Sequence, residues 1–167
     1  MRLLLVALIA EAMFAQQKAP KAEDIASPDA VVKAVYSVIS GNRGQPRDWN
    51  RMRGLFLPGA KLIGTRRKPG TPISVRIMDV EGYISATSKV FESVPFFESE
   101  TARKTETFGA VVHVFSTYQS KRSPDDAKPF ARGINSFQLL QMDDRWWVVS
   151  LIWDSETLDN PIPAEYK

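Results

Sequence analysis

The segment of residues 133–156, GINSFQLLQMDDRWWVVSLIWDSE, constrains the fold of this chain most strongly. It contains two apolar runs of strand length, which are joined by Asp143 and Asp144. Acidic residues in this position favour a tight turn between two antiparallel strands. We therefore predict a β-hairpin formed by residues 130–142 and 145–153, with three of the four tryptophans of the protein in its second strand.

The composition of each face of this hairpin follows from its turn, because side chains alternate along a strand. If the two aspartates form the loop, Met142 lies opposite Arg145 and every further pair is fixed. One face then carries Ile134, Ser136, Gln138, Leu140, Trp147, Val149, Leu151 and Trp153. The other face carries Asn135, Phe137, Leu139, Gln141, Trp146, Val148, Ser150 and Ile152. Both faces are mostly apolar, so we expect both to be covered.

Two arrangements would cover both faces of the sheet. We expect helices on one face and a second copy of the chain on the other, which makes the protein a homodimer that associates through the sheet. The alternative is a sheet that curls strongly enough for one chain to bury both faces, with a terminal tail helping to cover them.

The residues before the hairpin carry the signals of three helices and four more strands. Each helix begins after a capping residue and has a stripe of apolar side chains: residues 28–40 after Ser27, a second helix after Asp48, and a third after Asp79 that ends before Pro95. The additional strands are predicted at residues 60–67, 74–78, 97–107 and 110–121. This order predicts an α+β fold over residues 27–158, a cone-shaped roll of three N-terminal helices packed on a curved, mainly antiparallel sheet.

The ends of the chain differ from this domain. Residues 1–15, MRLLLVALIAEAMFA, have the charged start, apolar run and small residues of a secretory signal peptide, which is too short for a stable membrane span. The alternatives are an N-terminal core helix and an uncleaved membrane tether. We predict a flexible leader at residues 16–26 and a C-terminal tail at 159–167. The protein is then expected to be exported, either periplasmic or secreted.

Composition excludes several classes of site. The chain has no cysteine and a single histidine, so thiolate metal sites, disulfides and sites that need two histidines are excluded. The net charge of +3 and the short basic run at residues 66–68 are typical of a solvated surface, and we expect no nucleic-acid partner. No phosphate loop, nucleophile motif or metal cluster is present, and we predict no cofactor and no metal.

The predicted order of elements is two helices, a small strand, a third helix and then a long sheet that ends in RWWVVSLIW. This order resembles the nuclear transport factor 2-like superfamily, and it is most similar to the SnoaL-like and ketosteroid-isomerase-like branch of that superfamily. The resemblance covers residues 28–156 and is most specific at 143–153. It implies a cystatin-like cone whose sheet wraps around the helices and leaves an apolar cavity for a small hydrophobic molecule. It also implies dimerisation through the sheet.

The isomerases of this branch imply catalytic positions that this chain fills only in part. Their carboxylate base falls at Gly64 or Thr65 here, so the base is missing. Tyr36 lies one residue from the position of their helix tyrosine, and no Asp or Glu occurs inside the apolar strands. The alternating charges Glu98, Glu100, Arg103, Lys104 and Glu106 are expected to form exposed cross-strand pairs.

The remaining candidates are polar or aromatic residues on predicted helices and strands. His113 lies in the middle of a strand and could serve as a general base with Tyr36, or as a structural histidine. The predicted pocket residues are Trp49, Phe91, Asn135, Ser136, Gln138, Trp147 and Trp153. We expect an exported domain that binds a small hydrophobic ligand, or has an accessory role, without clear catalytic machinery. The alternatives are an isomerase, dehydratase or cyclase that uses His113, and a protein-interaction module that uses the sheet face.

Overall fold

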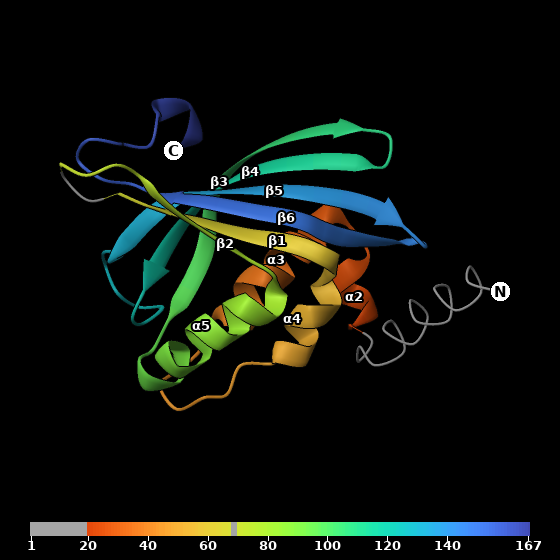
Figure 1. Cartoon of the computed structure of the whole chain (residues 1–167), viewed down its shortest axis with the longest axis horizontal. Coiled ribbons are helices and arrows are strands. Elements are labelled where there is room, and N and C mark those ends of the chain that lie inside the picture. Colours follow the sequence, from red (N-terminus) through yellow and green to blue (C-terminus); the bar gives the residue numbers. More distant parts are fainter. Residues whose placement is uncertain (1–19, 68–69) are drawn as a thin grey trace.

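The computed structural model describes residues 20–67 and 70–167 (Figure 1). The signal peptide predicted at residues 1–15 lies outside them. The helices are α2 (Ala22–Ile25), α3 (Pro28–Ile39), α4 (Trp49–Leu55) and α5 (Val80–Ser93), with a short 3-10 helix η1 (Ala164–Tyr166). The strands are β1 (Phe56–Arg66), β2 (Ser74–Met78), β3 (Phe97–Phe108), β4 (Val111–Lys121), β5 (Ala131–Met142) and β6 (Arg145–Ser155).

The three predicted helices form where their capping residues stand. The side chain of Ser27 accepts a hydrogen bond from the backbone N–H of Ala30, at 3.1 Å. Asp48 and Asp79 cap α4 and α5 in the same way. Each cap satisfies a backbone donor that the first turn of a helix leaves unpaired. The helix starts therefore follow from local sequence, as predicted.

The strands form one sheet in the order β2-β1-β6-β5-β4-β3. Strands β3 to β6 are consecutive antiparallel neighbours, whereas β1 pairs in parallel with β6. The sheet curves over α3, α4 and α5, which lie on one side of it (Figure 1). The α+β prediction is confirmed, and the second predicted helix is short, because α4 ends at Leu55 and β1 begins at Phe56.

The terminal hairpin keeps its predicted register only near the turn. Met142 lies opposite Arg145 and Leu139 opposite Val148, but Gln138 pairs with Ser150 because Val149 is an extra residue in β6. This β-bulge exchanges the faces of every later residue of the strand. Leu151 and Trp153 therefore join Asn135 and Phe137 on the face toward the helices, while Ser150 and Ile152 join Ser136 and Gln138 on the outer face. The predicted assignment of these faces is wrong beyond the bulge.

The segment just before the first helix is more ordered than its composition suggests. Residues 20–26 were predicted as part of a flexible leader, but Ala22–Ile25 forms the single turn of α2. Asp24 is buried and accepts two hydrogen bonds from the guanidinium of Arg51, each of 2.8 Å. This pairing lowers the pKa of Asp24. The contact with α4 therefore stabilises a turn that is too short to form a stable helix alone.

The C-terminal tail lies against the outer face of the sheet. Ile162 is buried, and the ring of Tyr166 packs edge-on against Phe115 of β4, with 5.0 Å between ring centroids. Thr117 donates a hydrogen bond of 2.6 Å to the backbone oxygen of Tyr166. The tail thus covers part of the face that was expected to meet a second copy of the chain. The homodimer stays a prediction.

Within the described part of the chain, no helix has both the length and the apolar character needed to cross a membrane.

Candidate functional site

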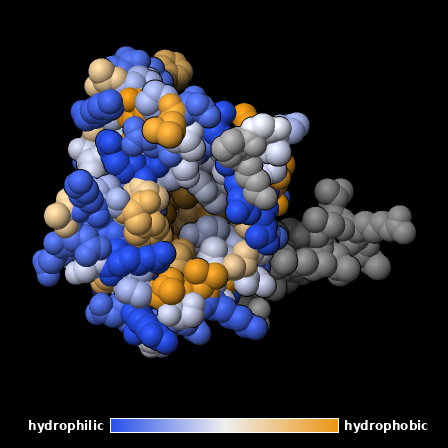
Figure 2. Space-filling model, turned by 90° about the vertical axis from the view of Figure 1, so that its left-hand side faces the viewer, coloured by the Kyte–Doolittle hydropathy of each residue, from blue (hydrophilic) through white to orange (hydrophobic). Residues whose placement is uncertain are grey.

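A cavity of about 290 Å³ lies between the helices and the inner face of the sheet. Figure 2 shows a hollow on the side of the molecule where β5 begins and β6 ends. Its apolar walls come from α3, α4 and α5, from strands β1, β5 and β6, and from two residues just before strands: Val35, Ile39, Met52, Leu62, Phe91, Phe96, Phe130, Ala131, Leu151 and Trp153. Its polar groups are Tyr83, Thr87, Glu98, Tyr118, Ser120, Asn135 and Ser155. We call this space the inner cavity.

Glu98, at the start of β3, is the ionisable acid of the inner cavity. Its backbone N–H donates a 3.0 Å hydrogen bond to the hydroxyl of Ser40, which fixes the start of β3 against the end of α3. Its carboxylate accepts hydrogen bonds from Ser120 Oγ at 2.8 Å and from Asn135 Nδ2 at 3.4 Å. Burial raises the pKa of Glu98 to about 7, and these two donors oppose that rise. Both the charged and the neutral form of Glu98 are therefore populated near neutral pH.

The prediction that Glu98 forms an exposed cross-strand pair is wrong, and a β-bulge explains why this acid reaches the cavity. In β3, Glu100 lies opposite Tyr118 and Ala102 opposite Thr117, so Thr101 is an extra residue. A regular strand would place the four even-numbered charges of this run on one face. The bulge separates them: Glu98 and Glu100 point to the helix side, whereas Lys104 and Glu106 lie opposite the outward residues Phe115 and His113. The predicted exposed pairing holds for Glu106, which contacts His113 at 3.2 Å.

Tyr36 stands behind the inner cavity, in a chain of hydrogen bonds that starts at Asn135. Asn135 Nδ2 donates to Tyr36 Oη at 3.0 Å, and Tyr36 Oη lies 2.7 Å from Ser116 Oγ. Ser116 in turn donates to the carboxylate of Glu100. Burial raises the pKa of Tyr36, so this phenol stays protonated and donates to Ser116. Tyr36 therefore orients Asn135 without lining the inner cavity itself.

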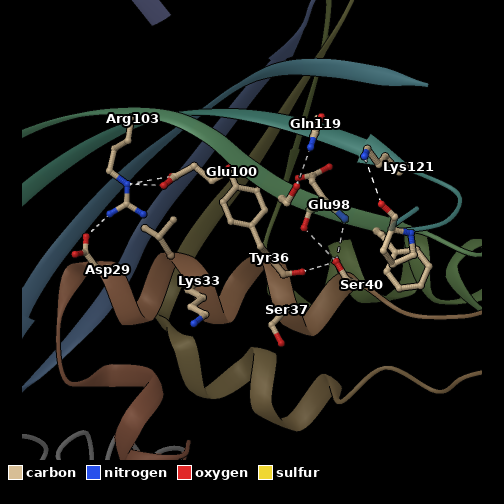
Figure 3. A pocket seen from close by; sticks show the side chains of 14 residues that line it. Asp29, Lys33, Tyr36, Ser37, Ser40, Glu98, Glu100, Arg103, Gln119 and Lys121 are labelled. Atoms are coloured by element: carbon tan, nitrogen blue, oxygen red, sulfur yellow. Dashed lines mark hydrogen bonds and ion pairs between the residues drawn. The ribbon is translucent and has the colours of Figure 1, made fainter. Parts of the chain in front are cut away.

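The series of hydrogen bonds ends at Glu100, in a second space between α3 and β3 (Figure 3). This space has a volume of about 630 Å³, and we call it the outer cleft. Tyr36, Glu98 and Glu100 belong to its lining. Arg103 lies between Glu100, at 2.8 Å, and Asp29 at the start of α3. Asp29, Glu100 and Arg103 are therefore paired with one another, whereas no ion pair of the described residues includes Glu98.

Two further tyrosines bring hydroxyl groups to the inner cavity. Tyr118 Oη lies 3.2 Å from Ser155 Oγ, and burial raises the pKa of Tyr118 to about 12. Tyr83 has its pKa raised first by burial and then by the negative charge of Glu98. Both hydroxyls are therefore neutral donors near the carboxylate. Tyr83 also packs edge-on against Trp153, with centroids 6.1 Å apart.

The predicted pocket residues divide into three that line the inner cavity and four that do not. Phe91, Asn135 and Trp153 line it. Trp49 stacks behind Phe91, with 6.3 Å between the ring centroids. The guanidinium carbon of Arg145 lies 3.4 Å from the centroid of the Trp147 ring. Ser136 and Gln138 face outward on β5. The three residues that line the cavity share the inner face of the sheet or the apolar stripe of a helix.

His113 is also on the outer face of the sheet. Its Nε2 lies 3.1 Å from Ser136 Oγ, and its backbone pairs with that of Gln138. The structure therefore brings together three predicted polar candidates, but on the side of the sheet away from the helices. The sequence suggested His113 and Tyr36 as catalytic partners. Tyr36 contacts the inner face of β4 from α3, whereas His113 lies on the outer face of the same strand.

The described residues contain no group of three or more His, Cys, Asp and Glu side chains arranged to hold a metal ion.

The sequence signal for Glu98 was weak because it lies in a run of charges typical of an edge strand. Its one distinguishing feature is the aromatic residues Phe96 and Phe97 directly before it.

No protein-family model and no curated protein matches this sequence. Solved structures of similar shape do exist. A protein of unknown function from Mycobacterium tuberculosis aligns with a TM-score of 0.59 and 15% identity, over 81% of this chain and 75% of its own. A protein with a cystatin-like fold from Nostoc punctiforme gives 0.57 and 8%, over 77% and 87%. An NTF2-like protein from Cytophaga hutchinsonii gives 0.56 and 13%, over 78% and 99%.

These similarities define the fold class. The chain has the cystatin-like, NTF2-like fold, an α+β arrangement of helices followed by a curved, mostly antiparallel sheet that does not close. At such low identities the likeness concerns the fold alone. The chemistry has to be argued from the inner cavity of this chain.

Proposed function

We propose that this protein binds a small, mainly apolar molecule in the inner cavity, with Glu98 as the polar anchor. The observation that carries the proposal is one ionisable carboxyl, with a pKa of about 7, in a cavity whose walls are otherwise largely apolar and aromatic. An apolar cavity with a few convergent polar groups is the usual form of a small-molecule site. A carboxyl group in such a wall loses hydration, and a bound polar group would restore its hydrogen bonds.

The size of the cavity limits the ligand. Its volume of about 290 Å³ is close to the lower end of the range for small-molecule pockets, which is about 300 Å³. Burial of apolar surface contributes about 25 cal/mol per Å². A molecule of one or two rings would gain most of its affinity from this contact. Glu98, Tyr83 and Asn135 would set its orientation.

Filling the cavity should abolish binding. Ala131 lines the inner cavity on β5, and Ala131→Phe would place a ring inside it. We expect the affinity for the uncharged two-ring fluorophore prodan to fall by about tenfold or more, which is about 1.4 kcal/mol. The measurement is a fluorescence titration. The matched control is Gln141→Phe, an exposed position of the same strand outside the cavity, which should change affinity by less than about twofold.

Two outcomes of this titration would count against the proposal. The wild-type protein could fail to bind the fluorophore or any molecule from a panel of one-ring and two-ring compounds. Alternatively, Ala131→Phe and Gln141→Phe could bind equally well, which would place the binding site elsewhere.

A second candidate function is proton transfer, because Glu98 has the pKa of an effective general base at neutral pH. Glu98 takes the role that the sequence suggested for His113. Glu98 would take a proton from the α-carbon of a β,γ-unsaturated ketone bound in the inner cavity and return it to the γ-carbon, which gives the α,β-unsaturated ketone. Asn135 or Tyr83 would donate to the developing oxyanion. We expect isomerisation, followed by ultraviolet absorbance, to rise with pH through about 7 and to fall about a hundredfold or more in Glu98→Gln. Equal rates in both proteins would exclude this function.

Export, membership of the SnoaL-like branch and association through the sheet remain predictions from the sequence. The outer face still offers a surface for association, since Val111 and Ile152 are 50% and 41% exposed there. The tail restricts such a contact to the part of the face that it leaves open.

A further inference from the structure

We propose that the inner cavity selects a ligand with a positive charge on an apolar body, an amine or a quaternary ammonium group, and that the charge lies at Glu98. This inference rests on the proposed function, because it names the class of molecule that the same cavity would bind. Its basis is the combination of an unpaired carboxylate and a surrounding set of aromatic rings.

The carboxylate of Glu98 has no cationic partner within the described residues. The partners that it has are the hydroxyl of Ser120 and the amide of Asn135, which are both neutral. The nine ion pairs of the described chain all lie elsewhere. Two neutral donors do not fully compensate for the loss of water around a partly buried negative charge. The charged form of the empty site therefore lacks a counter-ion.

The two arginines near this end of the fold already bind other groups. Arg47 is buried, and its guanidinium donates to the backbone oxygens of Ile39 at 2.9 Å and Gly41 at 2.8 Å. Arg103 contacts Glu100 and Asp29 in the outer cleft. A rearrangement that brought either cation to Glu98 would break these contacts. A counter-ion from outside the chain would enter the inner cavity without this cost.

Aromatic rings line the same cavity and suit a cation. Phe91 and Phe96 have centroids 4.7 Å apart, and Phe130 lies 6.1 Å from Phe96. Tyr83 and Trp153 supply two more rings, which meet edge to face. The face of an aromatic ring attracts a positive charge, by about 0.5 to 2 kcal/mol per contact. Carboxylate and rings together favour a cation over a neutral molecule of the same shape, and they disfavour an anion.

The charge of Glu98 makes this preference depend on pH. Across the outer cleft, which Glu98 also lines, the charged groups are Asp29, Lys33, Glu100, Arg103 and Lys121. On the side of the inner cavity the titratable groups that face it are Tyr36 of α3, Tyr83 of α5 and Tyr118 of β4, and the pKa values of all three tyrosines are raised. They stay neutral between pH 5 and 8. A permanently charged ligand should therefore bind more tightly as the pH rises through about 7, where Glu98 loses its proton.

The test compares benzyltrimethylammonium with neopentylbenzene, its uncharged carbon isostere. Affinities would be measured at pH 8 by ligand-observed NMR on the full chain. We expect the cation to bind at least about tenfold more tightly than the isostere. In Glu98→Gln, affinity for the cation should fall by about tenfold or more, while affinity for the isostere changes by less than about twofold. Glu106→Gln removes the same charge from the exposed side of β3, and it should change neither affinity.

A pH series on the wild-type protein gives a second, independent readout that requires no variant to fold. Affinity for the cation should fall by about tenfold between pH 8 and pH 5.5, and affinity for the isostere should stay constant. If both probes bind the wild-type protein equally at pH 8, or if Glu98→Gln retains the preference for the cation, the inference is wrong and the proposed binding function stands. If neither probe binds, and the fluorophore titration also fails, the proposed function is overturned together with the inference.

Discussion

Glu98→Gln should abolish most of the pH dependence of stability between pH 5 and pH 7.5. Burial raises the pKa of Glu98 from 4.5 to about 7, so the folded state holds this proton more tightly than the unfolded chain does. The stabilising contribution is complete below about pH 4.5 and is lost as the pH rises to about 7. The pKa difference corresponds to about 3 kcal/mol, and water in the cavity mouth reduces it, so we expect on the order of 2 kcal/mol.

Urea denaturation followed by tryptophan fluorescence at several pH values would measure this effect. The free energy of unfolding of the wild-type protein should decline across the window, while that of Glu98→Gln should stay nearly level. Asp24, Glu81 and Asp154 have lowered pKa values, so their contributions are lost at more acidic pH, outside this window. Glu106→Gln serves as the control and should follow the wild-type curve. A sloping curve for Glu98→Gln would show that another group is responsible.

Gly133→Ala should destabilise the protein by about 3 kcal/mol, because the neighbouring strands leave no room for a methyl group. A Cβ atom at this position would meet the backbone oxygen of Asp154 and would lie 2.5 Å from Tyr118 Oη. Gly133 is buried and pairs with Tyr118 on one side and Ser155 on the other, so the backbone cannot move away without breaking the sheet. The change also displaces a tyrosine that lines the inner cavity.

Thermal unfolding would detect this loss as a decrease in melting temperature of roughly 6 to 12 °C for a chain of this size. Gln141→Ala is the matched control, because Gln141 is exposed on the same strand. Its free energy of unfolding should change by less than about 0.5 kcal/mol. A melting temperature for Gly133→Ala close to that of the control would mean that β5 and β6 separate at this point with little cost.

The parts of the fold that the sequence predicted well depend on neighbours along the chain. Ser27, Asp48 and Asp79 cap helices through contacts three residues away. The turn at Asp143 and Asp144 is equally local, since both residues adopt positive φ angles, of 54° and 55°, that suit a two-residue hairpin. Such features can be predicted because no distant contact is needed to form them.

The failures share a different physical origin. Bulges at Thr101 and Val149 change which face a residue occupies, and alternation of residue types alone does not reveal an extra residue. They moved Trp153 into the cavity and separated Glu98 from the charges that follow it. The α2 turn around Asp24 is held by hydrogen bonds to Arg51, which is 27 residues away, and such a distant contact cannot be predicted from local composition. The candidate site therefore depended on the tertiary structure far more than the fold did.

The hydrogen-bond chain from Asn135 through Tyr36 and Ser116 to Glu100 has a consequence for proton movement. Its hydroxyl groups could pass a proton along, but its first member is an amide, which donates without relaying. A proton on Glu98 therefore has no relay through this chain to Glu100, but it needs none to reach solvent, because Glu98 lines both the inner cavity and the outer cleft. A ligand that fills the inner cavity would thus leave Glu98 able to exchange its proton through the outer cleft, and the protonation state of this carboxyl would follow the pH of the solvent while the ligand stays bound.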